Sequence, residues 1–352
     1  MPMPAPTHPT SRPFLRHSGA LLALCVGALL AACQPQNEQT AAAATPPVGH
    51  YEGSLGAAGQ AGARATLDIR HPSPGHYEAE FTAPGTLSFV ADTIVFSNNQ
   101  LRLSRPARPG QTLALTLDGD FWRGTLTLDS TKVTTLLVKR GVPTPTAYRT
   151  EEVPQATGSA WLFAPADTDT PGAALVLLPD AETAPTAAIW ADALAREGVI
   201  VLLLPPADSA TAAEETPRLQ AALRLLHGTS GADTTNIGMW AAGNRAATLA
   251  SLLTGPGAPR AAFFIAQNTV VDANTRAAFR ELRSRKMPLL ALYGGAGALA
   301  RSAAMRNALG GRRGAAVRVY RAAGADLLVP GSLGPVFGPG LPGEVVEWLR
   351  GQ

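Results

Sequence analysis

The stretch IWADALAREGVIVLLLPP, residues 189–206, joins a helical pattern to a continuous apolar run. Ile189, Ala193 and Leu194 share one face of a helix that we expect to end before Gly198. The run Val199–Leu204 follows and is closed by prolines, which suits a strand buried on both faces of a parallel sheet. This segment therefore predicts a helix that leads into a central strand.

The same alternation continues through residues 148–352. A second helix is expected around Leu219, Leu223 and Leu226, with Pro217 in its first turn and Gly228 at its end. Strands that alternate with helices predict an α/β class with a doubly wound, mostly parallel sheet. The other apolar runs are 173–178, 237–240, 261–266, 289–293 and 316–320.

Several segments, taken in order, resemble the α/β-hydrolase superfamily, and its small dienelactone hydrolases in particular. ALVLLP at 174–179 resembles the strand before the oxyanion loop, and WADALAREGVIV at 190–201 resembles the next helix and strand. DTTNIGMW at 233–240 resembles the approach to the nucleophile, and PLLALYG at 288–294 resembles the strand before the catalytic acid. The resemblance implies an α/β-hydrolase-like fold and a triad in the chain order nucleophile, acid, histidine.

The nucleophile position implied by this resemblance carries no hydroxyl group. The motif G-x-S-x-G is expected just after residue 240, where the sequence reads AAGNR, and the strand places the serine position at Gly243. A shifted alignment places it at Ala241, and no serine lies between Ser230 and Ser251. Because glycine adopts strained backbone angles without penalty, we expect the turn to persist without a nucleophile.

The acid and base positions are vacant as well. The resemblance places the acid at Gly297, with Asp272 as a substitute position that we interpret as a loop carboxylate or helix N-cap. It places the base at Asp326, whereas the last histidine of the chain is His227. Serine attack needs a base and a proton donor for the leaving group. Asp180 and Asp326 remain as a pair that could activate water, although ordinary loop acids are the preferred interpretation.

Residues 48–147 predict a small all-β domain, either a barrel or a sandwich, because short alternating runs are separated by turn signals. Trp122, Tyr51 and Tyr77 could line a ligand groove, but we interpret them as packing residues of the core or of the barrel mouth. His50, His71 and His76 fall near the expected turns and are interpreted as solvated loop residues, because their spacing fits no common metal site. The runs are 51–55, 65–69, 77–81, 87–90, 93–96, 101–103, 113–117, 124–128 and 133–138.

Residues 1–32 are typical of an export signal. Arg12 and Arg16 precede the apolar run 20–32, which is too short to favour a membrane span. LAAC at 30–33 resembles the lipobox of bacterial lipoproteins, so Cys33 is the expected lipidation site and residues 33–47 form a lipidated, flexible tether. We expect an exported protein held on a membrane by lipid, on the outer membrane if the cell is Gram-negative, because Gln34 rather than aspartate follows the cysteine.

Charge and motifs exclude several classes of partner. Without Arg12 and Arg16 of the export segment, 27 basic residues stand against 26 acidic ones, which gives no general case for nucleic-acid binding. No phosphate-loop, zinc-protease or calcium-loop motif is present, so we expect no cofactor and no metal. Residues 276–321 hold eleven basic residues against Glu281 alone, which fits either an anionic lipid, glycan or protein surface or simply solvated helix faces.

Two functions follow from these patterns. The first is a lipid-anchored, non-catalytic protein that uses a hydrolase scaffold for recognition, with the crevice at the strand C-terminal ends as the default ligand site. The second is an active ester or peptide hydrolase that uses relocated residues such as Asp180 and Asp326.

Overall fold

The computed structural model describes residues 45–56, 62–155, 158–207, 211–310 and 315–352. Residues Thr45–Gln352 form one compact unit with two large sheets. Within the described residues, no helix has the length and apolar character needed to cross a membrane. The predicted signal peptide, Cys33 and the tether up to residue 44 lie outside the described residues.

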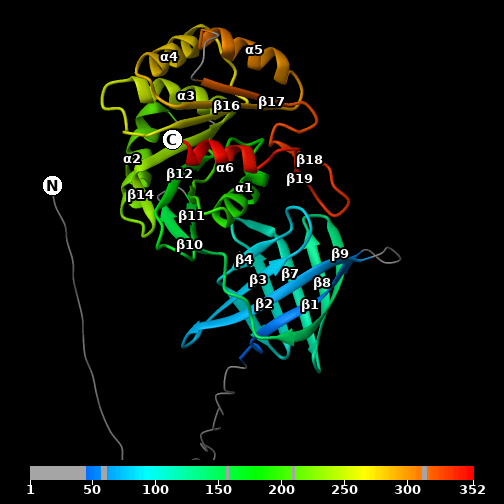
Figure 1. Ribbon diagram of the computed structural model, residues 1–352. Coiled ribbons are helices and arrows are strands. Elements are labelled where there is room, and N and C mark those ends of the chain that lie inside the picture. The colour runs from blue at the N-terminus through cyan, green and yellow to red at the C-terminus, as the bar shows by residue number, and fades with distance from the viewer. Residues whose placement is uncertain (1–44, 57–61, 156–157, 208–210, 311–314) are drawn as a thin grey trace, which may run out of the picture. The chain divides into compact units, whose positions relative to one another are not determined.

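The first sheet is antiparallel and curls on itself until it is nearly closed (Figure 1). Its strand order is β4-β3-β2-β1-β9-β8-β7-β6-β5, so β4 and β5 are the two edges. Each alternating run of the sequence coincides with one strand, which confirms the prediction of an all-β fold for this segment. The strands are β1 (Gly49–Gly56), β2 (Ala63–Ser73), β3 (His76–Thr82), β4 (Phe89–Ala91), β5 (Ile94–Ser97), β6 (Gln100–Arg105), β7 (Arg108–Asp118), β8 (Phe121–Leu128) and β9 (Thr131–Gly141).

The interior of this sheet is apolar because alternate side chains point inward. In β6, Leu101 and Leu103 are buried while their neighbours are exposed. Tyr51 and Trp122 are fully buried and pack edge to face, with ring centroids 6.1 Å apart, so their expected place in the core is confirmed.

The second sheet is mixed, with the order β10-β11-β13-β12-β14-β15-β16-β17. From β13 to β17 every neighbouring pair is parallel, while β10 and β11 are antiparallel additions at one edge. Its strands are β10 (Tyr148–Gln155), β11 (Gly158–Pro165), β12 (Gly172–Leu178), β13 (Ile200–Leu203), β14 (Ala232–Ala242), β15 (Phe264–Gln267), β16 (Leu289–Gly294) and β17 (Ala315–Tyr320); β18 (Leu328–Val329) and β19 (Val336–Phe337) form a separate small sheet.

Helices cover both faces of this second sheet, as a doubly wound fold requires. In β12, Val176 and Leu178 join the core beneath α2–α5, whereas Leu175 and Leu177 join the core beneath α1 and α6. The predicted α/β class, with a doubly wound and mostly parallel sheet, is confirmed. The helices are α1 (Ala184–Arg196), α2 (Ala212–His227), α3 (Gly243–Thr254), α4 (Ala273–Ser284), α5 (Ala298–Ala308) and α6 (Gly343–Arg350).

One local prediction about α2 is wrong. Pro217 was expected in the first turn, but the helix begins at Ala212 and contains Pro217 in its interior. The cause is a capping box: the Thr211 side chain accepts from the backbone of Glu214, and the Glu214 carboxylate accepts from the backbone of Thr211. Gly228 caps the C-terminus as expected.

Candidate functional site

The turn after β14 has the geometry that the resemblance implies for a nucleophile. Gly243 follows the last residue of the strand and begins α3, with a φ of 53°. This left-handed conformation is strained for residues other than glycine. The sharp strand-to-helix turn is therefore present, with a residue that supplies no side chain.

A carboxylate occupies the space beside this turn. A Cβ atom placed on Gly243 would overlap Asp180 Oδ2 and lie 3.1 Å from Asp180 Cγ. Asp180 follows β12 and is held by Thr183, whose backbone N–H (2.9 Å) and hydroxyl (2.7 Å) both donate to Asp180 Oδ1. The Asp180 side chain thus fills the region into which a side chain at residue 243 would extend.

The other two expected positions lie at the same edge of the sheet. Gly297 follows β16 and caps the N-terminus of α5 with a φ of 72°. Asp326 follows β17, where its Oδ1 accepts from Leu328 N–H (3.1 Å) and its backbone oxygen accepts from Trp190 Nε1 (2.9 Å). Because β14, β16 and β17 run parallel, Gly243, Gly297 and Asp326 all follow C-terminal strand ends.

Neutral amides, which the sequence pattern did not single out, connect the loops at this edge. Gln267, at the end of β15, accepts from Trp240 Nε1 (2.9 Å) and donates to the backbone oxygen of Ala325 (2.8 Å). Asn268 accepts from Gly294 N–H (3.0 Å) and from Arg301 (3.3 Å). The amides at the end of the apolar run 261–266 were a readable signal, since side chains at parallel strand ends converge. They position backbone but offer no nucleophile or base.

The proposed pair of Asp180 and Asp326 does not form a joint site through direct contacts. Each carboxylate accepts from its own loop, and among the described residues no hydrogen bond or ion pair joins the two. Two carboxylates that share a proton must be in contact or bridged for one to have a strongly raised pKa. Asp180 and Asp326 are therefore separate structural residues, and they do not form the pair that an active hydrolase with relocated residues would need.

Asp272 lies at the N-cap of α4. Its carboxylate accepts from the Thr275 backbone (2.8 Å) and hydroxyl (2.9 Å), and these bonds hold the pKa of Asp272 below its ordinary value. This is the role of a helix cap, which is the interpretation preferred from the sequence.

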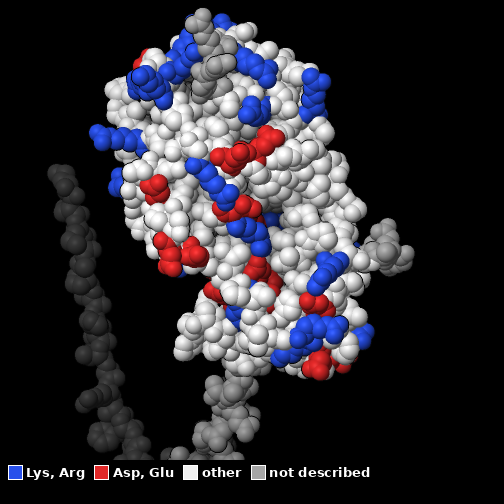
Figure 2. Space-filling view, in the orientation of Figure 1, with Lys and Arg blue, Asp and Glu red and all other residues white. Residues whose placement is uncertain are grey.

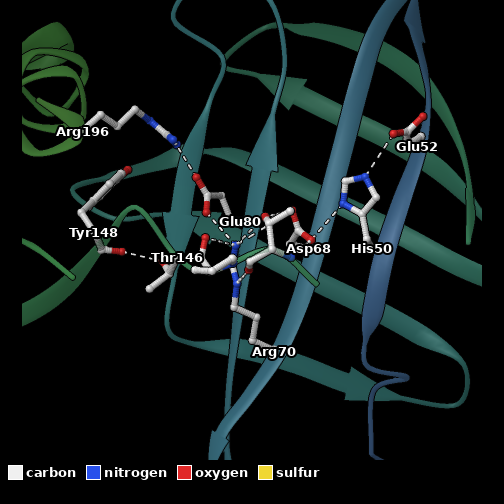
Figure 3. Close-up of polar contacts among 10 residues, drawn as sticks. His50, Glu52, Asp68, Arg70, Glu80, Thr146, Tyr148 and Arg196 are labelled. Carbon is white, nitrogen blue, oxygen red and sulfur yellow. Dashed lines mark hydrogen bonds and ion pairs between the residues drawn. The ribbon is translucent and has the colours of Figure 1, made fainter. Parts of the chain in front are cut away.

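A denser polar cluster lies in the first sheet and reaches α1 (Figure 3). Glu80 accepts from Arg70 (2.9 Å) and from Arg196 of α1 (2.6 Å). His50 lies between Asp68 (2.9 Å) and Glu52 (3.2 Å). The prediction of a solvated loop histidine is therefore wrong for His50: it sits in β1 directly opposite Asp68, a cross-strand register that sequence spacing does not reveal.

His50 is poorly suited to act as a base. Burial alone would lower its pKa, but the hydrogen bonds and negative charges of Asp68 and Glu52 outweigh burial and raise the pKa above its ordinary value. Both ring nitrogens face carboxylates, so neither is free to accept a substrate proton. We interpret the cluster as structural.

The basic segment 276–321 is partly compensated. Arg285 pairs with Glu281 (2.8 Å), and Arg318 lies 3.9 Å from Glu344. Figure 2 shows Lys and Arg side chains gathered over the end of the second sheet where α4 and α5 lie. The exposed residues Arg276, Arg280 and Lys286 have no ion pair among the described residues.

Comparisons with known proteins give a fold-level likeness. No family model and no curated protein matches the chain. Among solved structures, a protein from Klebsiella pneumoniae named as a dienelactone hydrolase is 14% identical over 59% of this chain and 100% of its own, with a TM-score of 0.43. Thermogutta terrifontis esterase 2 is 14% identical over 59% of this chain and 93% of its own, with a TM-score of 0.37.

A longer protein also matches. Porphyromonas gingivalis dipeptidyl peptidase 4 is 13% identical over 82% of this chain, with a TM-score of 0.41, and the match spans 48% of the peptidase. The chain is thus similar to hydrolase-fold proteins at low identity. Similarity this low says nothing of activity.

Proposed function

We propose that this protein is a lipid-anchored, exported binding protein whose α/β-hydrolase-like domain does not perform covalent catalysis. The observation that carries the proposal is the pair Gly243 and Asp180: the strained turn is kept by a glycine, and a hydrogen-bonded carboxylate fills the adjacent space. An acyl transfer in this fold needs an oxygen nucleophile at that turn. Neither Gly243 nor the neighbouring residues 241–245 supplies one.

The positions implied for the acid and the base support the same conclusion. Gly297 has no side chain, and Asp326 is bonded to its own loop. An aspartate at the base position would have to accept a proton from a hydroxyl, for which an imidazole is far better matched near neutral pH. Binding without turnover is therefore the function that we assign to the C-terminal ends of these strands.

A chromogenic ester assay tests the loss of catalysis. We expect the wild-type protein to hydrolyse nitrophenyl acetate and butyrate no faster than a heat-denatured sample, and Gly243→Ser to remain inactive because no base accompanies the new hydroxyl. Turnover by the wild type that disappears in Asp180→Asn or Asp326→Asn would overturn the proposal. Turnover that appears in Gly243→Ser would show that the protein has a general base at a position other than the one assigned here.

The lipid anchor rests on the segment LAAC and is tested separately. We expect radiolabelled palmitate to be incorporated in cells that express the full chain, and Cys33→Ser to abolish both the label and recovery in the membrane fraction. Equal labelling of wild type and Cys33→Ser would refute lipidation at this residue. In a Gram-negative cell we expect the labelled protein in the outer membrane.

The basic segment fits an anionic surface as partner. Arg276, Arg280 and Lys286 are exposed and lack ion pairs among the described residues, so their charge is available to phosphates. We expect the Cys33→Ser protein to sediment with phosphatidylglycerol vesicles at low salt, and the triple variant with glutamine at these positions to remain in solution. Binding unchanged by the triple variant would refute this surface.

A further inference from the structure

A cleft separates the outer wall of the first sheet from the β10–β11 hairpin of the second. Its volume is about 570 Å³. Val95 and Arg102 line it from β5 and β6, and Glu152 and Trp161 line it from β10 and β11. Clefts of about 300–1,000 Å³ at the junction of two packed units are the usual size and place of small-molecule sites.

The floor of this cleft is fixed by Arg105. This buried guanidinium donates to the backbone oxygens of Thr86 (2.8 Å) and Ser88 (3.3 Å) and to the Gln111 side chain (3.2 Å), and it pairs with Asp192 of α1. All of these partners belong to the protein, and the charge of Arg105 is neutralised by Asp192. The cleft is therefore preformed, and its floor contributes no free cation.

Three other charged groups around the cleft have no ion pair among the described residues: Asp92, Glu152 and Arg102. Asp92 is partly buried and accepts a long bond from Thr93 Oγ1 (3.4 Å). Burial raises the pKa of Asp92 above its ordinary value, although Thr93, Thr150 and the nearby His76 act in the opposite direction. A partly desolvated carboxylate that has no ion pair is stabilised by a cation that binds beside it. Two carboxylates against one arginine leave the cleft with a net negative charge.

The rest of the lining is apolar and includes an aromatic ring. Val95 is 59% exposed, and it lines the cleft together with Pro106 and Trp161. An exposed valine beside a tryptophan offers a surface that an apolar group would cover. Indole is also the side chain that attracts organic cations most strongly.

We propose that this cleft binds a small organic cation, a protonated amine that carries an apolar or aromatic body. The ammonium group pairs with Asp92 and Glu152, and the apolar body packs on Trp161 and Val95. Arg102, which lies opposite Val95 in the β5–β6 pair, disfavours ligands with a second positive charge. The site lies apart from Gly243, so its failure leaves the proposed loss of catalysis untouched, and an active esterase would not contradict it.

Three probes of matched shape and different charge test this proposal by calorimetric titration of the purified protein. They are 2-phenylethylamine, 2-phenylethanol and 3-phenylpropionate. We expect the amine to bind about tenfold more tightly than the alcohol, because the amine forms a charge pair with a partly desolvated carboxylate. We expect the propionate to bind most weakly. Equal affinities for amine and alcohol, or a preference for propionate, would overturn the proposal.

Two variants locate the binding. Asp92→Asn keeps the shape of the side chain, and we expect it to bring the affinity for the amine down to that for the alcohol while the alcohol is unaffected. Glu347→Gln is the matched control, because Glu347 lies beside Trp348 in a second cavity of about 540 Å³ near α6. An amine affinity that is unchanged in Asp92→Asn, or lost in Glu347→Gln, would refute the assignment to this cleft.

Discussion

Replacing Gly243 by alanine tests whether the carboxylate of Asp180 really fills the space beside the turn. The added methyl group has two separate costs. One is the left-handed backbone, which penalises any residue with a Cβ by about 1–2 kcal/mol. The other is the displacement of Asp180, whose Oδ1 accepts two bonds from Thr183 at 2.9 and 2.7 Å.

Gly257→Ala separates these two costs. Gly257 has a φ of 71°, and a Cβ placed there meets no atom within 4 Å, so it carries the backbone cost alone. The loss of chain entropy in the unfolded state is the same for both substitutions and cancels in their difference. Hydrogen bonds to a charged group contribute about 1.5–3 kcal/mol, so we expect Gly243→Ala to be the more destabilising by about that amount.

Urea unfolding of six proteins provides the measurement: the wild type, Gly243→Ala and Gly257→Ala, and the same three with Asp180→Ala. In the Asp180→Ala background the cost of Gly243→Ala should fall to that of Gly257→Ala, whose own cost should not change. If the two glycine substitutions cost the same within about 0.5 kcal/mol in the wild-type background, the two sites are uncoupled and the reasoning is refuted.

Two further outcomes are expected. Asp192→Asn removes the charged partner of the buried Arg105 and should lower the free energy of unfolding by about 3–5 kcal/mol. Glu197→Gln breaks the exposed pair with Arg350 and should lower it by at most about 1 kcal/mol. Similar losses in the two variants would contradict the argument from burial. The pKa of His50 is raised in the folded protein, so protonated His50 stabilises the fold. This contribution is fully present at a pH below 6.5, the ordinary pKa of histidine, and is lost as the pH rises through the pKa of His50 in the folded state. The stability gap between wild type and His50→Gln should therefore narrow from acidic to alkaline pH, and a gap that widens would contradict the assigned partners.

The antiparallel hairpin β10–β11 shows where sequence periodicity stops being informative. The segment YRTEEVPQ of β10 has no apolar run, because it is an edge strand in which half of the residues are exposed. Its pairing is specified by β11 along its whole length, from Tyr148 opposite Pro165 to Gln155 opposite Gly158. An edge strand buries few of its side chains, so its sequence shows little of the apolar periodicity by which strands are recognised.

The sequence by itself determined the two fold classes and the presence of a glycine at residue 243. Strands that face two cores are continuous in apolar residues, and strands that face one core alternate. Only the tertiary structure decided that Asp180 stands beside Gly243, that His50 pairs across strands with Asp68, and that Asp92 and Trp161 face one cleft. These contacts join residues far apart in the chain, and their geometry depends on strand register and on how the sheets pack, which local propensity does not encode.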